Sequence, residues 1–135
     1  GLGEPVFDKM NAMIAHAVCS IGAIKGIEFG EGFALTGIRA SEANDEFYIA
    51  DDGTVKTRTN SNGGILGGIS TGMPIVFSTA FKPTPSIALK QRTVDLETMT
   101  DTDIEIRGRH DPCIAVRAAV CVESAAAIAL ADLIL

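Results

Sequence analysis

The chain has 135 residues, of which 47% are hydrophobic and 21% are charged, so it can bury the core of one ordinary domain and is not typical of a disordered segment. Its formal net charge of -6 argues against nucleic acid as a partner, because a phosphate backbone is bound by a surplus of Lys and Arg. A small phosphorylated ligand is still compatible with this charge, since a few focused cations suffice to hold one phosphate.

The three cysteines, Cys19, Cys113 and Cys121, are odd in number and show no CxxC spacing. This favours free thiols in a reducing compartment, and hence a cytoplasmic protein, over a disulfide framework or a zinc site; no metal is expected. We expect Cys113 and Cys121 to be buried. Charged residues near the start argue against a secretory signal, and the missing initiator methionine indicates a piece of a larger protein.

The first predicted element is a helix. Apolar residues recur at three- and four-residue steps from Val6 to Val18, and Pro5 would stand in the first turn. Residues 25–29 then alternate in the way of a short strand, and the glycines at the two ends of residues 30–32 predict a turn.

The middle of the chain is polar and glycine-rich. Residues 41–72 show no long apolar period and are predicted to form functional or mobile loops, in which residues 44–46 mark the end of a hairpin. Residues 75–81 and 86–92 predict two strands separated by prolines, and residues 103–106 predict one more.

Residues 114–135 predict a closing helix that is apolar on almost every face and therefore buried in a packed interior. Arg117, Glu123 and Asp132 lie within this stretch, which favours a buried helix over a membrane span. The elements together predict an α+β fold in which antiparallel strands pack with helices, as one domain without repeats or linkers.

A glycine-rich segment is the first candidate for function. Residues 63–72 contain five glycines, so the backbone is free of side-chain bulk and can approach a flat or phosphorylated ligand. The segment matches neither the P-loop nor the dinucleotide-binding pattern. A flexible turn is the commoner outcome for a bare glycine run.

Two further segments combine cations with other polar groups. Residues 82–86 offer one ammonium and two hydroxyls between stiffening prolines, which suits a phosphate but also describes a surface turn. Arg109, His110 and Asp111 stand just before the last predicted helix. They predict either an anion clamp beside an acid/base group or a helix capped by Asp111.

Taken in order, these segments resemble the chorismate synthase family. The resemblance is carried by residues 1–9, 20–30, 63–70, 82–86 and 108–113, and by Arg117 and Glu123. Each motif alone is weak, but the ordered set is specific and extends over the whole chain.

The resemblance implies that the fold is part of the family's β-α-β sandwich and that residues 1–135 are a single C-terminal fragment carrying much of the FMN site. The reaction would be the anti-1,4-elimination of phosphate from 5-enolpyruvylshikimate 3-phosphate to give chorismate, using reduced FMN. This is the last step of the shikimate pathway, which leads to the aromatic amino acids. The parent enzyme would be a cytoplasmic homotetramer. The sequence leaves open whether NADPH or an outside reductase supplies the electrons.

The resemblance also implies site residues. Asp111 would lie near the flavin N5 as a catalytic residue. The cofactor-binding residues would be Gly22, Ala23, Gly67, Lys82, Pro83, Thr84, Pro85, Ser86 and Arg109.

Three departures from the family pattern matter. Gly22 stands where many members have asparagine, and residues 117–120 lack the usual proline. The proton-donating histidines and most substrate-binding arginines belong to an N-terminal part, and neither His16 nor His110 matches them by position. A non-catalytic oligomerisation or folding module is therefore the alternative to a lyase, and a generic phosphate-binding domain is a third reading.

Overall fold

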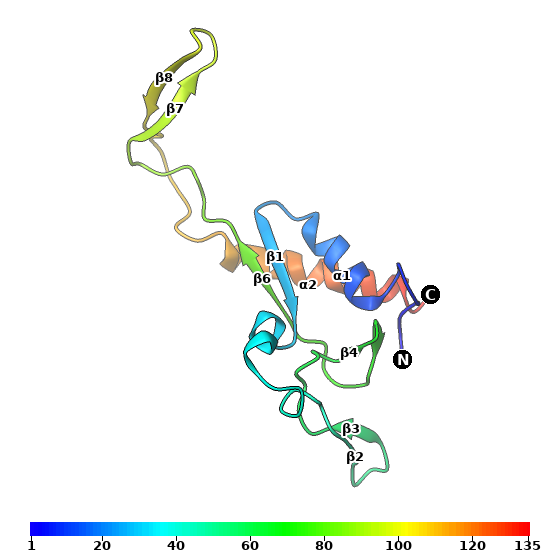
Figure 1. Ribbon diagram of the computed structural model, residues 1–135. Helices are drawn as coiled ribbons and strands as arrows, with labels where there is room; N and C mark the ends of the chain where they lie inside the picture. Colours follow the sequence, from blue (N-terminus) through cyan, green and yellow to red (C-terminus); the bar gives the residue numbers. More distant parts are fainter.

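The computed structural model describes residues 1–135 and has a helix near each end with short strands between them. The strands form four separate two-stranded sheets, and every pair is antiparallel. The predicted α+β class with antiparallel strands is confirmed. Figure 1 shows an elongated molecule in which the two helices and the β1–β6 pair make the central body, β4 lies beside α1, and the β2–β3 and β7–β8 hairpins extend outward.

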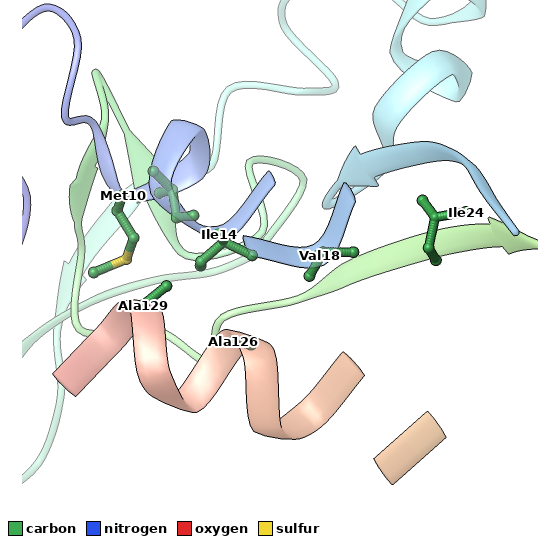
Figure 2. Packing of buried hydrophobic residues seen from close by; sticks show 7 residues of the cluster. Met10, Ile14, Val18, Ile24, Ala126 and Ala129 are labelled. Atoms are coloured by element: carbon green, nitrogen blue, oxygen red, sulfur yellow. The ribbon is translucent and has the colours of Figure 1, made fainter. Parts of the chain in front are cut away.

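The core lies between helix α1, Met10–Cys19, and helix α2, Ala115–Asp132. Met10, Ile14 and Val18 follow each other at four-residue steps along α1 and are fully buried. Figure 2 shows these side chains directed toward Ala126 and Ala129 of α2. Burying a side chain of this size stabilises the fold by about 1.5–3 kcal/mol. The helices run in opposite directions, so α2 begins at the end of the pair where α1 ends.

Helix α1 begins later than predicted. Residues 5–8 form turns and a bend instead of a first helical turn, and Val6 has a φ of 68°. Lys9 is the N-cap residue, and its side chain makes no capping bond. The Met10 amide donates instead to the carbonyl oxygen of Gly68 at 2.8 Å. A contact distant in sequence thus defines the start of the helix.

Strand β1, Ile24–Phe29, pairs with strand β6, Phe77–Phe81, and packs against α1. The register runs from Ile24 opposite Phe81 to Phe29 opposite Phe77, whose rings lie 5.9 Å apart. Strands were predicted at residues 25–29 and 75–81, and both are confirmed, although the second begins at Phe77.

Two short hairpins interrupt residues 41–72, so the prediction of loops there is only partly confirmed. Strands β2, Phe47–Ile49, and β3, Val55–Thr57, form one hairpin. Strands β4, Ile65–Leu66, and β5, Ile69–Ser70, form another. Strands of two or three residues are too short to show a period of two. A short 3₁₀ helix, η1, Gly32–Gly37, follows β1.

The last two strands are displaced from their predicted positions. Strand β7, Gln91–Asp95, pairs with β8, Thr100–Ile104, so no strand lies at residues 86–90 or 105–106. The Asp95 carboxylate accepts the amides of Glu97 and Thr98, which fixes the tight turn between them. This hairpin projects from the central body (Figure 1).

Helix α2 confirms the predicted helix but contradicts its predicted burial. Only Ala126 and Ala129 are buried, whereas Val116 is 80% exposed and Ile128 is 69% exposed. Within this chain, α1 covers one face of α2 and leaves the remaining apolar faces open. Neither helix combines the length and hydrophobicity needed to cross a membrane.

Candidate functional site

The β1–β6 pair joins two of the predicted cofactor-binding segments. Ala23 directly precedes β1 and Lys82 directly follows β6. The amide of Lys82 donates to the carbonyl oxygen of Ala23 at 2.8 Å. Because the strands are antiparallel, their register brings together residues that are far apart in sequence. Ala23 has a φ of 70°, which is uncommon for a residue other than glycine and reverses the chain after Gly22.

The segment after β6 offers donors without partners. The Lys82 side chain makes no ion pair or hydrogen bond, and the Thr84 hydroxyl oxygen is buried without a partner. A buried polar group left unpaired costs about 1–3 kcal/mol. Ser86 is half-buried nearby in the sequence, while Pro83 and Pro85 are exposed. A phosphate fits this set of donors, because its oxygens accept hydrogen bonds and carry negative charge.

Gly22 and Gly67 have open surroundings. A Cβ placed on either glycine would meet nothing within 4 Å. Gly67 lies in the turn between β4 and β5, where it adopts a φ of 63°. Its neighbour Gly68 contacts the first residue of α1, whereas Ala23 follows the end of that helix. A helix of ten residues is about 15 Å long, so Gly67 is not brought beside Ala23 and Lys82.

The segment before α2 forms an open, polar hollow of about 350 Å³, lined by Arg109, His110, Asp111 and Arg117. Asp111 Oδ2 lies 3.2 Å from Arg117 Nη1. The His110 ring nitrogen Nε2 lies 3.0 Å from the carbonyl oxygen of Ile106, and Arg109 makes no ion pair. Because α1 and α2 are antiparallel, this hollow belongs to the same end of the helix pair as Ala23 and Lys82.

Of the two alternatives for Asp111, the helix cap is excluded. The N-cap residue is Ile114, and no side chain makes a capping bond there. The carboxylate of Asp111 pairs with Arg117 in the first helical turn instead. Arg117 thus lies against a predicted catalytic residue.

The cysteines differ from expectation in their exposure. All three are free, and all are exposed, so the prediction that Cys113 and Cys121 are buried is wrong. Both lie on or beside α2, whose outer faces are uncovered in this chain. No three His, Cys, Asp or Glu residues form a group that could hold a metal ion.

Asp45 is a buried acidic residue that was interpreted from the sequence only as part of a hairpin end. It is 7% exposed, and its carboxylate accepts four hydrogen bonds. Oδ1 accepts the Thr59 hydroxyl at 2.6 Å and the Ser61 amide at 2.7 Å. Oδ2 accepts the backbone and side-chain amides of Asn62 at 2.8 and 2.9 Å. The sequence signal was the run of donors in residues 59–62.

The environment of Asp45 favours its charged form. Burial raises the pKa of this carboxyl, but the hydrogen bonds from Thr59, Asn62 and Ser61 outweigh burial and hold the pKa below its ordinary value of 3.8. The carboxylate therefore stays charged and accepts hydrogen bonds from several donors of one loop.

The glycine-rich segment is hydrogen-bonded along its length, unlike the flexible turn considered as an alternative. The Asn60 side chain accepts the Gly64 amide at 2.7 Å and donates to the Pro74 carbonyl oxygen at 2.9 Å. Gly63 has a φ of 63°, and a Cβ there would collide with the backbone of Gly30 and Val76. Gly63 is thus required for packing, while Gly67 leaves its backbone accessible.

Comparison with known proteins agrees with the resemblance. The family model for chorismate synthase matches residues 1–135. A chorismate synthase from Methanothermobacter thermautotrophicus is 60% identical over 132 residues, which are 98% of this chain and 35% of that protein. One from Dehalococcoides mccartyi is 55% identical over 135 residues, which are 100% of this chain and 37% of that protein.

A solved structure described as a crystal structure of chorismate synthase matches the fold with a TM-score of 0.71 and 34% identity. The match covers 98% of this chain and 33% of the solved chain, and it confirms the expected family fold. The chain thus spans about a third of the length of these relatives. Because the family model matches every residue and the fold agrees, the chain belongs to the chorismate synthase family.

Proposed function

We propose that the full-length protein carrying this chain eliminates phosphate from 5-enolpyruvylshikimate 3-phosphate by the anti-1,4 route and releases chorismate. Residues 1–135 would be a C-terminal part that supplies much of the FMN site. The observation that best supports this proposal is the family match over residues 1–135, which includes the segments around Ala23 and Lys82. The protein would be cytoplasmic and, when full-length, a homotetramer.

The FMN phosphate would be held by the segment after β6. The ammonium of Lys82 supplies charge, and the hydroxyls of Thr84 and Ser86 supply donors, with Thr84 having no other partner. Pro83 and Pro85 limit the conformations of this segment and so lower the entropy lost on binding.

Other parts of the flavin would contact the backbone of the glycine-containing segments and a second cation, Arg109. Gly22 and Ala23 are held beside Lys82 by the bond between the Lys82 amide and the Ala23 carbonyl. Arg109 makes no ion pair within the chain and would remain available for an anion. Gly67 would offer its accessible backbone from the β4–β5 turn.

When held by these residues, reduced FMN would supply electron density to the departing phosphate, and the elimination would also remove a hydrogen from C6 of the substrate. By the family resemblance, Asp111 would lie near the flavin N5 and accept a proton there. Its half-exposed carboxylate lines the hollow before α2. Arg117, 3.2 Å away, would hold that carboxylate in place. The chain would thus contribute binding, orientation and one proton acceptor.

A flavin titration tests this proposal. The full-length protein should bind FMN with a single saturable site per subunit, measured by flavin fluorescence, and the isolated chain should bind it more weakly. If the full-length protein binds no FMN, the chain belongs to a non-catalytic module and the proposed lyase function is wrong.

A further inference from the structure

We propose that Asp45 is a positioning residue whose buried carboxylate, together with Asn60, fixes the glycine-rich segment in the conformation that presents the Gly67 turn to the flavin. This inference rests on the proposed function and adds to it a residue that touches neither flavin nor substrate. Asp45 and Asn60, with the donors Thr59, Ser61 and Asn62, are called the Asp45 clasp below.

The clasp fixes the beginning of the segment. The four hydrogen bonds onto Asp45, between 2.6 and 2.9 Å, hold residues 59–62 in a single turn. Asn60 extends that hold to Gly64 through its carbonyl oxygen and to Pro74 through its amide. Strand β4 follows immediately at Ile65–Leu66, so Gly67 comes three residues after Gly64, which Asn60 holds.

The clasp also ties the segment to the β1–β6 pair. The Ser61 carbonyl oxygen accepts the Glu31 amide at 2.9 Å, just beyond β1. The Gly63 carbonyl oxygen accepts the Val76 amide at 3.1 Å, just before β6. One buried anion thus organises a loop that joins the two strands bearing the Ala23–Lys82 junction.

The far end of the segment is fixed independently. The Gly68 carbonyl oxygen accepts the Met10 amide at 2.8 Å, and the Ser70 amide donates to the Leu2 carbonyl oxygen at 2.9 Å. Because both ends are anchored, loss of the clasp would free only the residues between Thr59 and Gly67. The effect of Asp45 on this segment can therefore be measured separately from the stability of the helical core.

The test uses the full-length protein with Asp45→Asn, an isosteric change that turns one acceptor oxygen into a donor facing other donors. FMN should bind about 10- to 100-fold more weakly, since bonds to a charged acceptor are strong. Turnover at saturating FMN should recover to within about threefold, because binding and not the chemical step is impaired. Thr59→Val removes one bond and should shift the FMN affinity in the same direction by a smaller factor.

Asp52→Asn is the matched control. Asp52 accepts the amide and hydroxyl of Thr54 in the exposed β2–β3 turn but contacts no part of the clasp, so this variant should bind FMN as the wild type does. FMN affinity within about twofold of wild type for both Asp45→Asn and Thr59→Val, measured well below the melting temperature, overturns the inference. A wild type that binds no FMN overturns the proposed function and this inference with it.

Discussion

Lys82 offers the clearest separation between binding a phosphate and maintaining the fold. Its side chain is exposed and has no partner within the chain, so Lys82→Ala should leave the melting temperature nearly unchanged. A hydrogen bond to a charged group is worth about 1.5–3 kcal/mol, so FMN should bind about 10- to 150-fold more weakly in the full-length variant. Riboflavin lacks the phosphate and should bind equally to both proteins. Equal losses for the two flavins, measured by titration, would show that Lys82 has a structural role.

Asp111 can be tested in the same way, now that a helix cap is excluded as its structural role. Its pairing with Arg117 is exposed, and such surface pairs contribute about 0–1 kcal/mol. Asp111→Asn in the full-length protein should therefore barely change the melting temperature or FMN affinity. If the carboxylate accepts a proton, turnover should fall by about 10²–10⁴-fold. Near-normal turnover would leave Asp111 as a surface ion-pair partner.

Candidate site residues could be named from sequence through the family resemblance, but their contacts could not. The bond between Ala23 and Lys82 depends on the register of β1 and β6, which no local pattern encodes. Asp45 looked like an ordinary turn residue, because burial and four donors become visible only when residues 45 and 59–62 are brought together.

At the scale of elements, the glycine-rich segment should respond to acid through Asp45. The folded-state pKa of Asp45 is lowered below 3.8, so its ionised form contributes stability above the unfolded-state value of about 3.9. That contribution is lost as pH falls through the lowered pKa. Asp52 and Asp95 also have pKa values lowered by hydrogen bonds from Thr54 and Thr98, so a variant is needed to isolate Asp45.

Comparison of wild type with Asp45→Asn isolates the contribution of the Asp45 carboxylate. Hydrogen exchange at the Ser61 and Asn62 amides should be slower in wild type than in the variant near neutral pH. The difference, corrected for intrinsic rates, should shrink below about pH 3.9 as the wild-type carboxylate is protonated. A difference that persists unchanged to pH 2 would contradict the role of the charge.

The longer elements were predictable from sequence and the shorter ones were not. The spacing of apolar residues identified both helices and strands β1 and β6, because each of these elements is long enough to bury one face. The two- and three-residue strands within residues 47–70 pair across short turns and show no apolar period. Helix α2 was predicted as buried because of its composition, but its outer apolar faces are exposed in this chain.

At the scale of the whole molecule, the chain spans about a third of the relatives it matches, and its isolated form should not turn over substrate. The resemblance assigns the proton-donating histidines and most substrate-binding arginines to another part of the parent. General acid catalysis alone typically supplies about 10²–10⁴-fold in rate, and positioning supplies more. Chorismate formation by the purified chain with reduced FMN, measured anaerobically, would contradict this expectation.

The central claim is that the full-length protein is a flavin-dependent lyase, and product stoichiometry tests it most directly. The full-length protein should release one phosphate for each chorismate formed from 5-enolpyruvylshikimate 3-phosphate, measured anaerobically by phosphate assay and chorismate absorbance. Turnover should require reduced FMN and should be absent with oxidised FMN or without flavin. Phosphate release that proceeds without flavin, or no release from a folded protein that binds reduced FMN, would contradict the account.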